Sequence, residues 1–110
     1  MSQLTTHVLD TALGRPAAGV PVVLSARFDR QWTLVGSEVT GLDGRAGFLG
    51  PDPVPVGSYR FVFDTAAYFA ATEQVSFLPE VVVVFDVVDD SHYHVPVLLS
   101  PFAYSTYRGS

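Results

Sequence analysis

The sequence predicts an all-β protein: a two-sheet antiparallel β-sandwich of seven or eight strands with one short helix. Three observations lead to this fold class. Segments rich in Val, Phe and Tyr alternate between apolar and polar residues with a period of two, as half-buried strands do. Clusters of Gly, Pro and Asp separate these segments at short intervals. Only one stretch favours a helix, so the crossover helices of an α/β fold are missing.

The first half of the chain predicts a pair of strands and a short third one. In VPVVLSARFD, the side chains that share one side are Val20, Val22, Leu24, Ala26 and Phe28. The pattern continues in QWTLVGSEVT, from residue 31, and ends in the turn GLDG. RAGFL, from residue 45, predicts a short strand, and GPDPVPVG predicts a connection because proline cannot donate to a strand ladder.

The second half predicts two more patterned strands, the helix and a buried strand. SYRFVFD alternates, with Tyr59, Phe61 and Phe63 on one face. TAAYFAATEQ, from residue 65, is the expected helix, with Asp64 or Thr65 as its N-cap. VVVVFDVV, from residue 81, suits a strand covered on both faces. HYHVPVLLS, from residue 92, follows the acidic turn DDS.

Length and charge limit what the protein does. A chain of 110 residues, 48% hydrophobic and 15% charged, predicts a single folded domain over residues 1–110. Its net charge is −5, and all six basic residues are arginines scattered along the chain. Without a basic stripe, we expect neither nucleic acid nor an acidic membrane surface as a partner.

Cysteine usage and hydropathy suggest a location. The chain has no cysteine, so disulfides, thiolate nucleophiles and cysteine-bound zinc are excluded. The opening MSQLTTHVLD lacks the charged and apolar regions of an export signal, which predicts a cytoplasmic protein. The longest apolar run, Val81 to Phe85, is too short to span a bilayer.

Three histidines are the main candidates for chemistry. On a strand, His92 and His94 point to one face while Tyr93 and the alternating apolar residues after it face the core. A single outward histidine is most often an ordinary surface residue, but two beside Pro96 suggest a pocket or an interface. His-x-His together with His7 also fits a three-histidine zinc site, an alternative that spacing alone leaves open.

Arg45 is the other candidate. It is opposite in phase to Ala46 and Phe48, so if those two face the core, Arg45 faces outward with the histidines. A solvated arginine is the ordinary interpretation, and binding of a planar anion is the functional one. The chain has no Gly-x-Ser-x-Gly and no phosphate-binding glycine loop, and Asp89 and Asp90 suit a turn.

Three stretches together resemble a known family. HVLDTALGRPAAGVPV, TGLDGRAGF and HYHVPVLLSPFAYSTYRGS occur in this order over essentially the whole chain. They resemble the transthyretin-related 5-hydroxyisourate hydrolases, and the ending YRGS separates these hydrolases from the hormone carrier transthyretin. The resemblance implies a transthyretin-like β-sandwich and a homotetramer, a dimer of dimers, with active sites at the interface between dimers.

The resemblance also implies a reaction and its residues. The catalytic positions are His7, Arg45, His94 and Ser110. The implied substrate-binding positions are His92, Tyr107, Arg108 and Gly109, with His92 the least secure. The reaction is hydrolysis of 5-hydroxyisourate to 2-oxo-4-hydroxy-4-carboxy-5-ureidoimidazoline in urate breakdown, with no metal and no organic cofactor.

We hypothesise that His7 and His94 position and deprotonate a water that attacks the ring carbonyl. Arg45 would hold the anionic substrate and disfavour a protonated histidine nearby. Donors to the carbonyl oxygen are Arg45, Arg108 or backbone N–H groups near Ser110, and the choice stays open. The alternative function is a non-enzymatic carrier of a hydrophobic ligand in the channel between dimers. We expect the tail, residues 107–110, to be ordered by contacts between subunits.

Overall fold

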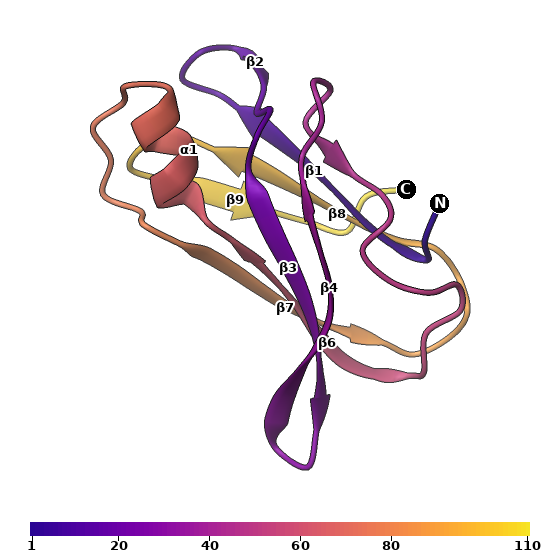
Figure 1. Cartoon of the computed structure of the whole chain (residues 1–110). Helices are drawn as coiled ribbons and strands as arrows, with labels where there is room; N and C mark the ends of the chain where they lie inside the picture. Colours follow the sequence, from indigo (N-terminus) through magenta and orange to yellow (C-terminus); the bar gives the residue numbers. More distant parts are fainter.

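The computed structural model describes all 110 residues and consists of two β-sheets packed face to face, with one helix at one end (Figure 1). The longer strands are β1 (Leu4–Asp10), β3 (Pro21–Phe28), β4 (Gln31–Val39), β6 (Gly57–Phe63), β7 (Val81–Val87) and β8 (Tyr93–Leu99). The short ones are β2 (Arg15–Pro16), β5 (Arg45–Ala46) and β9 (Tyr104–Thr106), and the helix is α1 (Thr65–Ala71). The predicted sandwich with one short helix is confirmed.

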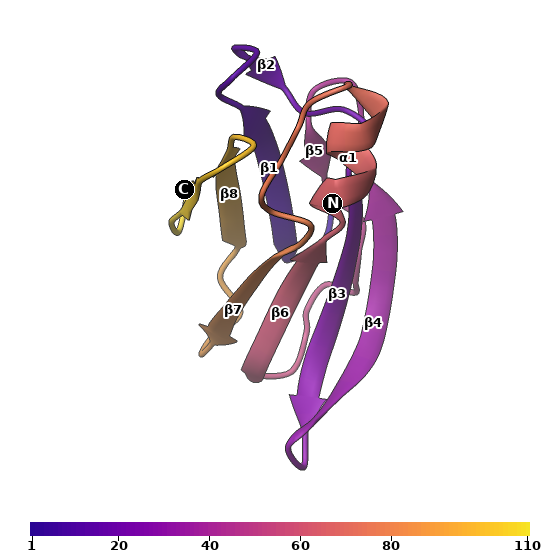
Figure 2. The ribbon, with the colours of Figure 1, turned by 90° about the vertical axis from the view of Figure 1, so that its left-hand side faces the viewer.

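One sheet has the strand order β2-β1-β8-β9, with β5 also paired to β1, and the other has the order β4-β3-β6-β7. Figure 2 shows the two layers from the side. The prediction of a wholly antiparallel sandwich was wrong in one pair of strands, because β1 and β8 run parallel. These strands lie far apart in the sequence, so no tight hairpin forces them to be antiparallel.

The core lies between the two sheets and follows the predicted alternation. Tyr59, Phe61 and Phe63 of β6 are at most 3% exposed. The alternate residues of β3 from Val22 to Ala26 are also buried. Phe28, expected on the same side, is 55% exposed. The β3–β4 hairpin extends past the opposite sheet, so nothing covers its tip (Figure 1).

Strand β1 was not among the segments that the pattern identified. Its residues Thr5 and Thr6 are adjacent and both buried, which hides the alternation. Burial is possible because both hydroxyls are hydrogen-bonded; that of Thr6, for example, donates to the Val95 carbonyl at 2.6 Å. Polar residues with satisfied hydroxyls can therefore occupy a central strand.

Helix α1 begins at Thr65, and its N-cap is Asp64, one of the two predicted caps, whose carboxylate accepts a hydrogen bond from the Ala67 N–H at 3.0 Å. It ends at Ala71, earlier than the stretch of helix-forming residues. No helix in the structure has the length and hydropathy needed to cross a bilayer.

Two strand predictions were wrong in extent or burial. Strand β5 ends at Ala46, and Phe48 is 74% exposed rather than in the core. The reason is that the Gly47 and Phe48 N–H groups donate to the Glu38 carboxylate instead of continuing the strand ladder. Strand β7, expected to be covered on both faces, pairs only with β6 at the edge of its sheet. Val82 and Val84 point outward from it and are 38% and 56% exposed.

An aspartate at the end of β1 ties the first sheet to the helix. Asp10 is 1% exposed, and its carboxylate accepts hydrogen bonds from the Ala12 and Leu13 N–H groups. It also accepts from the Tyr68 hydroxyl at 2.6 Å and from Gln74 at 3.1 Å. Four donors therefore compensate the burial of this charge.

Candidate active site

The strand register brings the predicted residues to the outer face of the first sheet. Thr5 of β1 pairs with His94 of the parallel strand β8. On the other edge of β1, His7 pairs with Arg45 of β5. Beyond β9, Gly109 forms an isolated bridge with His94 on the far side of β8. Four separate segments thus meet within a few strand spacings.

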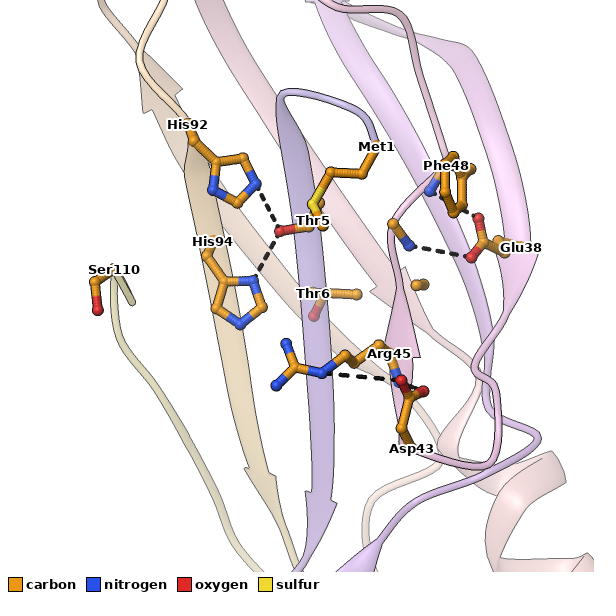
Figure 3. Close-up of a pocket in the computed structure, with 12 residues that line it drawn as sticks. Met1, Thr5, Thr6, Glu38, Asp43, Arg45, Phe48, His92, His94 and Ser110 are labelled. Atoms are coloured by element: carbon orange, nitrogen blue, oxygen red, sulfur yellow. Dashed lines mark hydrogen bonds and ion pairs between the residues drawn. The ribbon is translucent and has the colours of Figure 1, made fainter.

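A pocket of about 510 Å³ opens on this face. Arg45, His92, His94 and Ser110 line it, four of the eight residues that the sequence indicated. Figure 3 shows Arg45 reaching across β1 toward His94, with Ser110 on the other side of β8. The remaining lining residues are Met1, Thr5, Thr6, Glu38, Asp43, Ala46, Gly47 and Phe48.

A glycine turn places Arg45. Gly44 has φ +77°, and a Cβ there would lie 2.4 Å from the Val8 carbonyl oxygen, so only glycine fits this left-handed position against β1. The Asp43 carboxylate accepts a hydrogen bond from the Arg45 N–H at 3.0 Å and lies 3.9 Å from its Nε. The terminal guanidinium nitrogens have no partner within the chain and face the pocket (Figure 3). Arg45 is therefore a permanent cation whose terminal donors are free to bind a ligand.

The Thr5 hydroxyl holds the His94 ring by a hydrogen bond. Its Nδ1 lies 2.8 Å from the Thr5 hydroxyl, and the same hydroxyl lies 3.0 Å from Nε2 of His92 (Figure 3). Burial lowers the pKa of His94 below its usual 6.5, and the charges of Arg45, His92 and His7 lower it further. His94 is therefore neutral at pH 7, with a ring nitrogen able to accept a proton.

His7 does not line the pocket with the other residues. Its ring centroid is 6.4 Å from that of His94. Its Nε2 is buried and has no hydrogen-bond partner within the chain. The structure therefore places His7 next to the candidate base, but not among the residues that line the pocket.

The tail is ordered by its own chain. The Gly109 N–H donates to the His94 carbonyl at 2.7 Å. A Cβ at Gly109 would lie 2.9 Å from Cδ2 of His94, so the glycine allows the backbone to pack against the imidazole. The prediction placed this ordering in contacts between subunits; within one chain, strand β8 already provides it.

Arg108 and Tyr107 point away from the pocket. The Arg108 guanidinium lies over the Tyr93 ring, 4.0 Å from its centroid, and donates to the Ser91 hydroxyl and the His92 carbonyl. Tyr107 is 58% exposed and lines a smaller cavity of about 170 Å³ between β7, β8 and β9. Neither side chain reaches the site with Arg45 and His94.

Sequence reasoning missed Thr5 and Glu38. Thr5 is 4% exposed and bridges the two histidines, and Glu38 fixes the pocket wall through the Gly47 and Phe48 N–H groups. The signal for Thr5 was the pair Thr5–Thr6 beside a histidine, which becomes informative only when the parallel register with β8 is known. The three histidines, in contrast, are not arranged as a metal-binding cluster.

Comparisons with known proteins show which family and which solved structures this chain resembles. Residues 4–109 match the model of the HIUase/Transthyretin family. The chain is 47% identical to the 5-hydroxyisourate hydrolase of Mus musculus, over 99% of this chain and 96% of that protein. Among solved structures, the 5-hydroxyisourate hydrolase of Klebsiella pneumoniae superposes with TM-score 0.89 at 36% identity, covering 100% of both chains.

A transthyretin has a fold similar to that of this chain. Sea bream transthyretin, solved in complex with thyroxine, superposes with TM-score 0.92 at 34% identity, covering 97% of this chain and 94% of that one. The sandwich alone therefore does not separate enzyme from carrier, whereas the full-length identities do establish the lineage. On sequence and on fold, the chain belongs to the HIUase/Transthyretin family, in which HIUase denotes 5-hydroxyisourate hydrolase.

Proposed function

We propose that this protein is a 5-hydroxyisourate hydrolase that opens the ring of its substrate by attack of water on a carbonyl. One observation carries the proposal: a single pocket holds a neutral histidine, His94, next to a permanently charged arginine, Arg45. Such a pair suits an anionic planar substrate and a base that works at neutral pH. The hydrolases with 36–47% identity over the full chain support the same activity.

In this mechanism His94 takes a proton from water as the water oxygen bonds to the ring carbonyl carbon. The tetrahedral intermediate then breaks its C–N bond, and the imidazolium returns the proton to the leaving nitrogen. The product carries the new carboxylate, as expected of 2-oxo-4-hydroxy-4-carboxy-5-ureidoimidazoline in urate breakdown. Arg45 binds the substrate anion and stabilises charge on the carbonyl oxygen, a contribution that typically reaches ~10²-fold or more per donor.

The remaining predicted residues fall into two groups. Ser110 lines the pocket and is proposed to contact the substrate. His7 keeps a buried nitrogen without a partner, a state that costs about 1–3 kcal/mol and suits a group that gains its hydrogen bond in the substrate complex. Tyr107, Arg108 and Gly109 are proposed to act by holding the tail beside His94 rather than by touching the substrate.

We also propose that the active form is a homotetramer, a dimer of dimers. Strands β7 and β9 are both sheet edges, and the cavity between them shows that they lie on the same side of the sandwich. Unpaired edges are available for pairing with another chain. The pocket face also exposes Phe48, which is 74% exposed, as a contact for a second dimer.

A carrier function is the second candidate, because the thyroxine-bound transthyretin superposes with TM-score 0.92. The experiment that separates the two follows the absorbance decay of freshly generated 5-hydroxyisourate with and without the protein. Acceleration supports the hydrolase, and decay at the spontaneous rate, together with saturable binding of a hydrophobic ligand, supports the carrier.

The base is tested by His94→Asn with Arg45 intact. We expect turnover to fall by ~10²–10⁴-fold, the usual contribution of a general base. His7→Asn, measured in parallel, separates the two histidines, and a smaller loss is expected because His7 is not among the residues that line the pocket. Wild-type turnover in the His94 variant would rule out the assignment.

A further inference from the structure

One hydroxyl serves two histidines. The Thr5 oxygen lies 2.8 Å from Nδ1 of His94 and 3.0 Å from Nε2 of His92. Thr5 is 4% exposed and His94 is half-buried, so water does not readily replace the Thr5 hydroxyl as the partner of His94. The two imidazoles are nearly parallel, with an interplanar angle of 19° and centroids 6.2 Å apart. The hydroxyl therefore links their hydrogen-bonding states.

The proton count restricts these states. A threonine hydroxyl has one proton to donate and can accept, and a neutral imidazole has one N–H and one bare nitrogen. If both facing nitrogens were bare, one of them would lack a donor, because Thr5 has only one proton. At least one histidine must therefore donate to Thr5, and the tautomer of His92 constrains that of His94.

Two arrangements use every group. In the first, Thr5 donates to His94 and accepts from His92, which leaves the remaining His94 proton on Nε2. In the second, Thr5 donates to Nε2 of His92 and accepts from the His94 Nδ1–H, which leaves Nε2 of His94 bare. Only the second arrangement gives His94 a lone pair on the nitrogen away from Thr5, where it can act as a base.

Arg45 decides between them. In Figure 3 the ring nitrogen of His94 that does not face Thr5 points to the side where the Arg45 guanidinium lies. A guanidinium carries only donors, so it favours a bare nitrogen and opposes an N–H pointing toward it. The second arrangement is therefore the stable one.

We propose that Thr5 is a positioning residue that fixes the tautomer of His94: its hydroxyl donates to His92 and accepts from His94 Nδ1–H, so that Nε2 of His94 is bare and faces the pocket. His92 thereby acquires a role as the acceptor that takes the Thr5 proton. The catalytic consequence rests on the proposed hydrolase function, whereas the tautomer is a property of the free protein.

The test uses ¹⁵N-histidine-labelled protein without substrate, in which ring nitrogen shifts distinguish protonated from bare nitrogens. We expect His94 to be protonated at Nδ1 and His92 at its own Nδ1. Thr5→Val removes the hydroxyl with little change of shape, and we expect a mixture of His94 tautomers and a fall in kcat of about 10-fold or more, part of what a positioned base provides. Thr5→Ser, which restores a hydroxyl, should recover both.

Thr40→Val is the matched control. Thr40 is also 4% exposed, and its hydroxyl likewise makes two hydrogen bonds, to Ala17 and Val20, away from the pocket. This variant should lose stability without changing the histidine shifts or kcat. A His94 proton on Nε2 in the wild type, or an unchanged tautomer in Thr5→Val, would overturn the inference. Absence of turnover in the wild type would instead contradict the hydrolase proposal.

Discussion

At the scale of residues, the properties of the candidate site depend on the groups that contact the imidazole of His94. His94 is contacted by the Thr5 hydroxyl, by the backbone of Gly109 and by the field of Arg45. Each contact acts on a different property: the tautomer, the ring position and the pKa. A histidine on an exposed strand face without these neighbours would be an ordinary surface side chain.

The pKa of His94 makes the pH dependence of the reaction a direct check. Burial is the main cause that lowers this pKa below 6.5, and Arg45 is the next. Since the base must be unprotonated, we expect kcat/KM to be constant near neutral pH and to fall as pH drops through the lowered pKa. Arg45→Gln removes one cause, so the midpoint of this acidic limb should move up toward 6.5.

The measurement is a pH profile of kcat/KM, which reports the free enzyme, alongside an NMR titration of His94. Arg45→Gln also weakens substrate binding, but that loss lowers the whole profile and does not move its midpoint. A midpoint above 6.5 in the wild type, or one that is the same in both proteins, would contradict the assignment.

At the scale of elements, some strands are predictable from sequence and others depend on partners. The alternation in β6 is enough to predict which face is buried, and β8 follows the same period of two except at Pro96, which is also buried. Strand β1 is hidden, since Thr5 and Thr6 are buried with partners on β8 that the local sequence does not show. Strand β7 is apolar except for Asp86, so its sequence does not distinguish a central strand from an edge.

The site follows the same division. The motifs indicate Arg45, His94 and Ser110, and the structure joins them in one pocket. The burial of the His7 Nε2 and the orientation of Arg108 could not be predicted, because both depend on side-chain rotamers rather than on strand phase.

Arg108 is expected to act by fastening the tail to β8. Its contacts with the Tyr93 ring, Ser91 and the His92 carbonyl are on the surface, where a cation–π contact contributes about 0.5–1 kcal/mol. Arg108→Ala should therefore leave global stability nearly unchanged. Because Gly109 and Ser110 would no longer be held beside His94, we expect turnover to fall by about 10-fold. Hydrogen exchange of the Gly109 amide should become faster.

Arg27→Ala, on the exposed end of β3, is the control and should change none of these. Deletion of residues 107–110 should reduce turnover at least as much while the fold remains intact. If Arg108→Ala loses turnover while the Gly109 amide stays protected, Arg108 touches the substrate instead; normal turnover in the deletion variant would show that the tail is not needed.

Asp10 is expected to make the junction of β1 and α1 sensitive to acid. Burial tends to raise its pKa, but hydrogen bonds from Tyr68, Leu13, Gln74 and Ala12 together lower it below 3.8. The stabilisation is therefore complete above 3.8 and is lost as pH falls through the lowered pKa. Asp10→Asn should reduce the free energy of unfolding by about 2–3 kcal/mol at neutral pH and flatten the dependence at acid pH.

Urea unfolding at pH values on both sides of 3.8 measures this effect, with Asp90→Asn as the exposed control. Equal acid sensitivity of Asp10→Asn and the wild type would show that other carboxyl groups dominate. The pocket is remote from this junction, so histidine tautomers should be the same in both proteins.

At the scale of the whole molecule, the sandwich leaves two kinds of surface unused. One side carries the free edges of β7 and β9, and the outer face of the first sheet carries the open pocket with Phe48 beside it. A monomer would expose both to water. The proposed dimer of dimers uses the edges for the dimer and the pocket face for the contact between dimers.

This arrangement predicts that activity depends on protein concentration. We expect a mass about four times the 11.9 kDa of one chain by light scattering, and turnover per chain that falls when dilution dissociates the dimers from one another, because the pocket then opens to solvent. His94→Asn should have the same mass profile as the wild type, which separates assembly from chemistry. A monomer with full turnover per chain would show instead that one sandwich contains the complete site.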